Sequence, residues 1–343
     1  MREKTDEQRA ALEKMLNGFR LTDVLCAGVE LGVFEVLEKK PLAAEQVRQK
    51  LKTDRRGTEI LLNSMAALDL LEKKNGAFRL SPLARRFLVE GSPEYLGNMV
   101  MHTANLRHAW LRIPESVRTG APAPRPEKTA KDRKARTRSF ILAMADGSRG
   151  QAAQLAAALD LSNVSRVLDV GGGPGTYLFE MVKKKPDITG AVFDLPATLE
   201  ITWELIAENK LEHAVGTIAG DFNVDELGSG YDLVLLSSIV HIYSTKENAR
   251  LVKRCFNALN PGGQIVVKEF LLDPGGASPL HAALFSVNML VNTDGGSAYT
   301  EKEIGAWMSA AGLRGIKRTD LPPRSSIMVG FKPGGKKRKR SKA

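Results

Sequence analysis

The chain has 343 residues, 43% of them hydrophobic, and this length and composition predict two domains with packed cores. Its formal net charge of +11 includes six positive residues among the last eight positions, so the remainder carries only about +5. No apolar run approaches the roughly 20 residues that a membrane-spanning helix needs, and the charged first residues argue against a signal peptide. Cys26 and Cys255 lie far apart in apolar helical patterns, which predicts reduced core residues of a cytoplasmic protein.

Residues 1–105 are predicted to form a small helical domain with one β-hairpin. The hairpin spans residues 71–80, because Asn75-Gly76 favours the tight turn that joins two short strands. Apolar residues at helical spacing predict four helices, at residues 10–16, 21–31, 44–51 and 58–71. Helices followed by a hairpin are the layout of a winged helix, which usually indicates DNA binding.

The helix that would read DNA argues against that function. Residues 58–70 contain no lysine or arginine, whereas a helix that enters a groove needs basic or amide side chains at exposed positions. We therefore expect no nucleic-acid partner. The domain is expected to mediate homodimer formation instead, with Met65, Leu68 and the helix at 24–31 contributing apolar surface. A winged-helix regulator that senses a ligand remains the alternative from another functional class.

Two further segments precede and follow the second domain. Residues 106–160 are predicted to be linker helices that contribute to a substrate pocket, and a proline-rich segment at 119–126 interrupts them. At the other end, Gly334-Gly335 leads into the basic residues, so residues 334–343 are predicted to form a disordered tail. Such a tail could contact an anionic surface, although a solvated appendage is the simpler interpretation.

Residues 161–333 alternate short apolar runs with helical patterns, which predicts an α/β domain with a doubly wound parallel sheet. The expected strands lie at residues 166–170, 190–193, 215–218, 231–237, 264–270 and 325–331. Pro261-Gly262-Gly263 is expected to end the helix that precedes the fifth of these strands.

A glycine-rich turn directly follows the first expected strand of this sheet. The segment from Asp169 to Gly175 reads D-x-G-x-G-x-G, and Thr176 occupies the place of the last glycine in the dinucleotide pattern. Glycines such as Gly171 and Gly173 allow the backbone to approach a ligand closely. The carboxylate of Asp169 would repel a pyrophosphate but would attract the ammonium and sulfonium groups of S-adenosylmethionine.

Further acids follow in the order that such a cofactor requires. Asp194 ends the second strand, 23 residues after Gly171, where a ribose diol would be held. Asp221 and Phe222 follow the third strand and offer a carboxylate and an aromatic ring to the adenine. Each acid alone would more often be a helix cap or a turn residue. Together and in this order, they predict S-adenosylmethionine as the cofactor.

His241 follows the fourth strand and Glu269 lies at the end of the fifth, and the carboxyl ends of these strands are expected to meet at one edge of the sheet. A phenol, with a pKa near 10, is a poor acceptor for a methyl group until its proton is removed. An imidazole can take that proton, and a carboxylate behind the ring fixes its tautomer. A lone histidine at a strand end is more often structural, but its pairing with an acid makes His241 the candidate general base and Glu269 its partner.

With these motifs the chain resembles the caffeate/hydroxyindole-type O-methyltransferases, in their bacterial small-molecule branch. The resemblance extends from about residue 15 to residue 332, and its motifs lie at residues 27–34, 70–72, 168–175, 193–196, 220–222 and 259–263. It implies a class I methyltransferase fold with an N-terminal winged-helix dimerisation domain. It also implies that His241 is the general base and that the cofactor contacts include Gly171, Asp194, Leu195, Asp221 and Phe222.

The chain departs from the plant members of that family near the expected site. Ala298 replaces a second acid that flanks the histidine, Ser237 replaces a cofactor-contacting lysine, and Ile242-Tyr243 replaces Asp-Trp. Ser237 nevertheless remains a candidate cofactor contact. Relatives of this fold also methylate carbon or nitrogen, and a few retain the cofactor without methyl transfer, so these activities stay open as alternatives.

The resemblance further implies that the acceptor is an aromatic or polyketide-like small molecule with a hydroxyl group. Its pocket would be lined by Phe140, Met144, Phe285, Met289 and Asn292. The last three share one helical face, at positions i, i+4 and i+7, although each could also be a core residue. No cluster of acids or amides has the spacing of metal ligands, since Asp294 stands alone, and no metal is expected.

Overall fold

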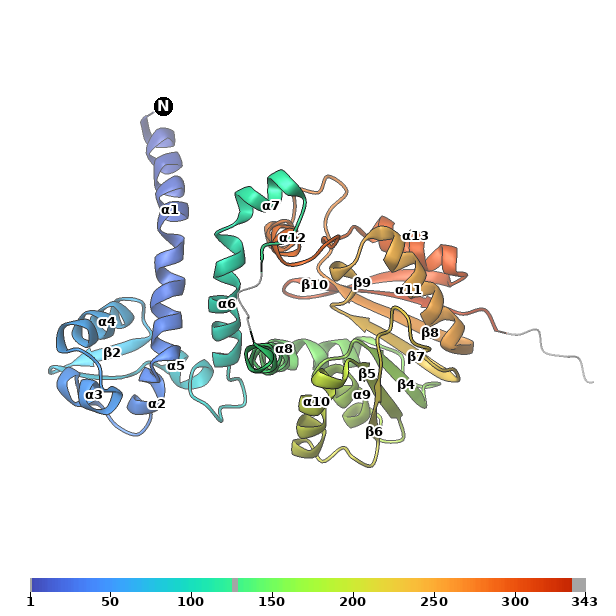
Figure 1. The fold of residues 1–343 in the computed structure, drawn as a ribbon, viewed down its shortest axis with the longest axis horizontal. Helices are drawn as coiled ribbons and strands as arrows, with labels where there is room; N and C mark the ends of the chain where they lie inside the picture. Colours follow the sequence, from blue (N-terminus) through green and yellow to red (C-terminus); the bar gives the residue numbers. More distant parts are fainter. Residues whose placement is uncertain (1, 125–128, 335–343) are drawn as a thin grey trace, which may run out of the picture. The chain divides into compact units, whose positions relative to one another are not determined.

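The computed structural model describes residues 2–124 and 129–334, and the chain divides into two compact units between Arg107 and His108. Figure 1 labels most of the helices and strands of both units. Apart from Gly334, the predicted basic tail lies outside the described residues. None of the helices in the described ranges combines the length and hydrophobicity that crossing a membrane requires.

The N-terminal unit packs helices against a small antiparallel sheet with the strand order β1-β3-β2. Its elements are α1 (Arg2–Glu30), α2 (Val33–Leu37), β1 (Leu42–Ala43), α3 (Ala44–Leu51), α4 (Arg55–Ala67), β2 (Leu71–Lys74), β3 (Ala77–Leu80) and α5 (Pro82–Phe87), and the boundary between the units falls within α6 (Gly97–Trp110). The predicted hairpin is confirmed, because Asn75 and Gly76 have φ angles of 51° and 79° and join β2 to β3. Phe34, Leu62 and Phe78 are fully buried in the core of the unit.

Two expectations for this unit are wrong. The helices expected at residues 10–16 and 21–31 form one continuous helix, α1, because Gly18 between them remains helical and has open space around it. Met65, expected at a dimer contact, is fully buried by side chains of its own unit. The exposed apolar side chains of this unit lie mainly on α1, at Leu12, Met15, Leu16, Phe19 and Leu21.

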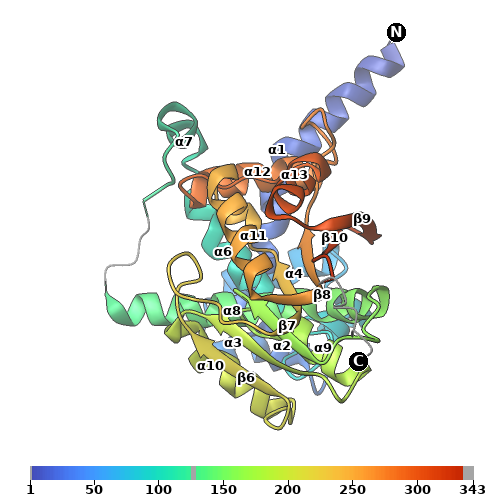
Figure 2. The ribbon, with the colours of Figure 1, turned by 90° about the vertical axis from the view of Figure 1, so that its right-hand side faces the viewer.

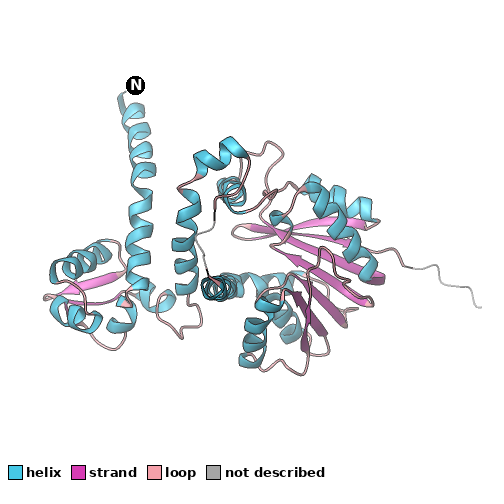
Figure 3. Cartoon of the chain, viewed as in Figure 1, coloured by secondary structure: helices cyan, strands magenta, loops and turns pink. Residues whose placement is uncertain are grey.

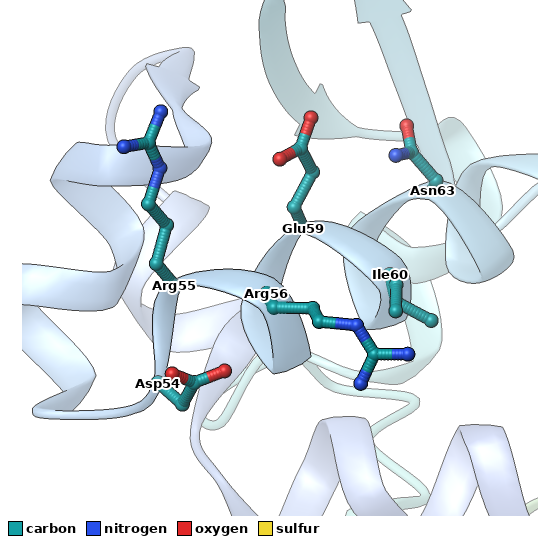
Figure 4. A pocket seen from close by; sticks show the side chains of 6 residues that line it. All are labelled: Asp54, Arg55, Arg56, Glu59, Ile60 and Asn63. Atoms are coloured by element: carbon teal, nitrogen blue, oxygen red, sulfur yellow. The ribbon is translucent and has the colours of Figure 1, made fainter.

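The helix that would read DNA, α4, begins at Arg55 rather than at residue 58. Asp54 caps this helix, because its Oδ1 accepts a hydrogen bond from the backbone nitrogen of Gly57 at 2.8 Å. The first turn of α4 therefore contains two arginines that the predicted boundary leaves out. An open hollow at this end of the helix is lined by Asp54, Arg55, Arg56, Glu59, Ile60 and Asn63 (Figure 4). Its side chains fan outward and carry both signs of charge, so they do not form a basic surface.

The C-terminal unit is an α/β domain on a seven-stranded sheet with the order β6-β5-β4-β7-β8-β10-β9. Its elements are α7 (Ile113–Thr119), α8 (Ala130–Ala158), β4 (Arg166–Val170), α9 (Thr176–Lys184), β5 (Thr189–Asp194), α10 (Pro196–Glu208), β6 (Val215–Ala219), β7 (Tyr231–Ser237), the 3-10 turn η1 (Val240–Ile242), α11 (Thr245–Ala258), β8 (Leu259–Glu269), α12 (Leu280–Asn292), α13 (Glu301–Ala311), β9 (Arg314–Leu321) and β10 (Ser325–Phe331).

The sheet is mixed, whereas the sequence predicts a parallel one. The five neighbouring strands from β6 to β8 run parallel, as expected. At the far edge β10 pairs antiparallel with both β8 and β9. The sequence does not predict β9, because it is an exposed, charged edge strand without an apolar run.

Pro261-Gly262-Gly263 lies within β8 and does not end a helix, contrary to the prediction. The preceding helix, α11, already ends at Ala258. The backbones of Gly262 and Gly263 pair with that of Lys332 through hydrogen bonds of 3.0 and 2.8 Å, so the sheet continues past the proline. A pairing partner this remote in sequence leaves no local signal.

Helices cover both faces of the sheet (Figures 2 and 3). α11 and α13 pack on one face, with Cys255 and Trp307 among the buried side chains. α8, α9 and α10 pack on the other face, with Leu155 and Met181 in its core. Cys26 and Cys255 are both free and buried, as predicted. Because side chains alternate along a strand, residues near each strand end face one helical layer or the other.

Candidate functional site

The glycine-rich turn after β4 brings the backbone close to the carboxyl ends of the strands. Gly171 and Gly173 have φ angles of 64° and 52°, in the left-handed region that favours glycine. A Cβ at Gly172 would lie 2.5 Å from the carboxyl carbon of Asp169, so the turn has no room for a side chain there. The backbone nitrogen of Gly171 donates to the carbonyl oxygen of Phe193 at 2.7 Å, which ties the turn to β5.

Asp169 is fully buried, and neither of its carboxylate oxygens has a hydrogen-bond partner among the described residues. Burial, and secondarily the charge of Asp194, raises the pKa of Asp169 to about 7. A buried carboxylate without donors is unfavourable unless a ligand brings donors or positive charge. Ser237, at the end of β7, likewise has a buried Oγ without a partner in the described ranges. These acceptors without a partner fit the cationic groups of S-adenosylmethionine.

Asp194 ends β5 beside the glycine-rich turn. Its Oδ2 accepts a hydrogen bond from the backbone nitrogen of Gly173 at 2.9 Å, and its Oδ1 accepts one from that of Leu195 at 2.7 Å. Burial raises the pKa of Asp194. Each oxygen keeps a lone pair for one more donor, such as a ribose hydroxyl. Leu195 itself is 53% exposed and precedes the first turn of α10.

Asp221 and Phe222 follow β6, the strand next to β5. Phe222 is mostly buried next to Gly171, and its ring packs edge-on against that of Tyr243 with the centroids 5.7 Å apart. Asp221 Oδ1 accepts hydrogen bonds of 2.9 Å from the backbone and side-chain nitrogens of Asn223. Oδ1 therefore orders the local turn, as the simpler interpretation of this acid predicts.

His241 and Glu269, predicted as a pair, are in direct contact. His241 Nδ1 lies 3.0 and 2.9 Å from the two carboxylate oxygens of Glu269. The two residues are only 8% and 3% exposed. With the carboxylate accepting, Nδ1 carries the proton and Nε2 keeps a lone pair that can accept another.

Three residues that the sequence analysis does not identify hold the loop around His241. Asn248 is fully buried, and its Nδ2 donates to backbone oxygens just before and after the histidine, at 2.7 and 3.0 Å. The Tyr299 hydroxyl donates to the backbone oxygen of Tyr243. A Cβ at Gly296 would lie 2.2 Å from the backbone oxygen of His241, so this position requires glycine. The Gly-Gly sequence at 295–296 is a local signal for the close approach at Gly296.

The predicted acceptor residues on α12 have different surroundings. The Phe285 ring packs edge-on against the His241 ring, with the centroids 4.7 Å apart. Met289 is only 6% exposed and Asn292 Nδ2 donates to the backbone and side-chain oxygens of Asn288. Phe285 is therefore the residue of this helix that contacts the histidine directly.

The other two predicted acceptor residues lie on α8. Phe140 is 39% exposed, and Met144 is half-buried. Between them, Ile141 is buried, and its Cδ1 lies 3.6 Å from the position of a Cβ at Gly173. This part of α8 therefore packs beside the glycine-rich turn.

Two family models match the chain. One, described as an O-methyltransferase domain, matches residues 119–314, and the other, described as an O-methyltransferase dimerisation domain, matches residues 13–90. The first match covers more than half of the chain and contains the glycine-rich turn, Asp194, His241 and Glu269.

Similar proteins align over nearly the whole chain. The 3-hydroxy-5-methyl-1-naphthoate 3-O-methyltransferase of Streptomyces sahachiroi is 37% identical over 94% of this chain and 94% of its own. The N,N-dimethyltransferase OxyT of Streptomyces rimosus is 32% identical over 95% of this chain and 97% of its own. Among solved structures, human N-acetylserotonin methyltransferase in complex with SAM has a TM-score of 0.86 and 28% identity, covering 95% of this chain and 98% of that one.

Proposed function

The chain belongs to the family of S-adenosylmethionine-dependent O-methyltransferases, and on that premise we propose the reaction that it catalyses. It transfers a methyl group to a hydroxyl of an aromatic or polyketide-like small molecule, with His241 as the general base. The observation that carries this proposal is the buried contact between His241 Nδ1 and the carboxylate of Glu269. The relative named for a hydroxynaphthoate supports an aromatic acceptor.

The cofactor would be held by the polar side chains at the carboxyl ends of the strands. Asp169 would meet its positively charged groups, and Asp194 would accept hydrogen bonds from its ribose hydroxyls. Asp221 and Phe222 would hold the adenine, and Ser237 would offer its Oγ, which has no partner among the described residues. When bound, S-adenosylmethionine supplies an electrophilic methyl group.

The chain itself makes the acceptor reactive by moving a proton. His241 Nε2 takes the proton of the acceptor hydroxyl, while Glu269 holds the ring in place and stabilises the positive charge that the imidazole gains. Phe285, edge-on to the imidazole, lines the acceptor side together with Phe140, Met144, Met289 and Asn292. Aromatic and thioether side chains suit a flat, apolar acceptor.

Methyl transfer can be tested with purified protein, labelled S-adenosylmethionine and a panel of acceptors. Hydroxylated naphthoates and polyketide-like phenols should gain a methyl ether, identified by mass spectrometry. The same panel should contain aromatic amines, because a relative of 32% identity is named an N,N-dimethyltransferase. Methylation of amines alone, or of carbon, would contradict the proposed hydroxyl acceptor.

Cofactor affinity should depend on pH near neutrality because of Asp169. The raised pKa of about 7 means that the ligand-free protein keeps this carboxyl protonated and neutral at lower pH. Binding of a cationic group requires the ionised form, so affinity for S-adenosylhomocysteine, which keeps the ammonium group, should rise with pH. We expect binding at pH 6 to be about tenfold weaker than at pH 8, measured by calorimetry. Asp194, whose pKa is also raised, acts in the same direction.

Asp169→Asn is the matched control for that pH dependence. Asparagine has nearly the same shape but no titrating proton, so the variant should bind more weakly at pH 8 and lose most of the dependence. An unchanged pH profile in Asp169→Asn would assign the titration to another group.

We expect the protein to be a homodimer that associates through α1. Leu12, Met15, Leu16 and Phe19 are 52–77% exposed and lie at i, i+3, i+4 and i+7, so they form one apolar stripe. Replacing Leu12 and Leu16 with glutamate should give monomers by light scattering at micromolar concentration. Val224→Glu is the control, since Val224 is 72% exposed in the other unit. A dimer that persists in the double variant would exclude this stripe as the contact.

A further inference from the structure

Lys268 is a buried cation that neither the catalytic pair nor the predicted cofactor residues include. It lies near the end of β8 and is only 3% exposed. Its Nζ donates to Ser238 Oγ at 3.1 Å, and no carboxylate of the described residues forms an ion pair with it. Buried lysines are rare unless an opposite charge pairs with them. The ammonium group of Lys268 has no such partner among the described residues and could bind an anionic group of a ligand.

The sheet register places Lys268 on the same face of the sheet as Asp169 and Ser237. Lys268 pairs with Ser237 across β7 and β8, and the residues two positions earlier, Leu235 and Val266, also pair. Leu235 pairs in turn with Asp169 of β4. Because side chains alternate, Asp169, Ser237 and Lys268 face the layer of α8, α9 and α10, whereas Glu269 faces the other layer.

Lys268 also lies close to the start of α9. Its Nζ is 5.7 Å from the ring centroid of Tyr177, the second residue of that helix, which begins directly after the glycine-rich turn. The Nζ is also 4.9 Å from the ring centroid of Phe270. Aromatic faces attract a cation but leave its hydrogen-bond donors free for an anion.

We propose that Lys268 binds the α-carboxylate of the methionine part of S-adenosylmethionine, while Asp169 binds the neighbouring α-ammonium group. The inference extends the proposed cofactor site and rests on it. Two buried groups of opposite charge, neither with an ion-pair partner among the described residues, lie on one face of the sheet and match the two charges of an amino acid zwitterion. Ser237, the register partner of Lys268, also has a buried Oγ without a hydrogen-bond partner among the described residues.

The same cation could instead pair with a carboxylate on the acceptor, because Phe270 packs against Phe285 with the ring centroids 4.9 Å apart. The sheet face favours the cofactor. Lys268 shares its face with Asp169 and Ser237, and the His241–Glu269 pair that serves the acceptor involves the opposite face.

Calorimetry with two ligands tests the assignment. S-adenosylhomocysteine has the amino acid group, whereas 5′-methylthioadenosine has the nucleoside without it. Lys268→Met should weaken binding of S-adenosylhomocysteine about 10- to 100-fold, the effect of losing a charged hydrogen bond, and should leave methylthioadenosine binding unchanged. Lys268→Arg should keep most of the affinity, because the charge is retained. Unchanged methylthioadenosine binding also shows that the variants fold.

A second measurement uses the unaltered protein and therefore does not depend on the folding of a variant. Decarboxylated S-adenosylhomocysteine should bind at least about tenfold more weakly than the intact compound. Equal affinity for these two ligands, or an equal loss of both ligands in Lys268→Met, would overturn the proposal. A variant that binds S-adenosylhomocysteine normally but has a raised KM only for carboxylate-bearing acceptors would also overturn it and assign Lys268 to the acceptor. None of these outcomes bears on whether the product is a methyl ether, so the reaction is tested separately.

Discussion

Replacing His241 with alanine is expected to lower turnover on a hydroxyl acceptor by about 10²–10⁴-fold, the usual effect of removing a general base. Cofactor affinity should not change, because the buried imidazole contacts Glu269 and Phe285, and Glu269 faces the layer opposite to that of Asp169 and Ser237. Single-turnover kinetics with saturating S-adenosylmethionine, together with calorimetry of S-adenosylhomocysteine, would measure the two effects separately.

Two controls make the His241 result specific. Glu269→Gln should lower turnover less than His241→Ala, because it removes the charge behind the ring while leaving the imidazole itself. Ala298 stands in place of a second acid, so Glu269 should matter more here than in relatives that have both. Raising the pH toward 10 should restore part of the activity of His241→Ala on a phenolic acceptor, because the hydroxyl then ionises without a base. If His241→Ala retains most of its activity, the acceptor is an amine or a carbanion and the general-base proposal fails.

Replacing Asp194 with alanine is expected to weaken cofactor binding by about 1.5–3 kcal/mol, the range for a lost charged hydrogen bond. This corresponds to roughly 10- to 150-fold in affinity for S-adenosylhomocysteine, measured by calorimetry. The effect has two sources. The carboxylate would accept hydrogen bonds from the ribose hydroxyls. It also accepts hydrogen bonds from the backbone nitrogens of Gly173 and Leu195, and these bonds hold the turn in shape.

Asp194→Asn separates these two contributions, because the amide oxygen can still accept from one backbone nitrogen but carries no charge. Asp187→Ala serves as the surface control, since the Asp187 side chain is 70% exposed and pairs with Lys185. A change in Asp194→Ala no larger than in Asp187→Ala would remove Asp194 from the cofactor site.

The sequence by itself determined the features that are local in the chain. The glycine-rich turn could be recognised because its positive φ angles require glycine at fixed spacing. The hairpin at Asn75-Gly76 followed from the same rule. The resemblance to the O-methyltransferase family rested on such segments, and the family models confirm it.

The contact between His241 and Glu269 was predictable for a different reason. Each residue follows a buried apolar strand, and consecutive parallel strands in a doubly wound sheet are commonly neighbours. Although 28 residues separate them in the sequence, His241 and Glu269 lie at the ends of adjacent strands and can therefore meet. Their roles in catalysis, like those of the predicted cofactor and acceptor residues, stay predictions for the experiments above.

Only the tertiary structure decided the features that depend on remote partners. The charged edge strand β9 is a strand because β10 pairs with it, and Pro261-Gly262-Gly263 stays in the sheet because Lys332 lies alongside. Lys268 lies within an expected strand, but the sequence assigns it no role. Its burial, and its place on the face of Asp169 and Ser237, follow from the register of three strands, which no local pattern of residues encodes.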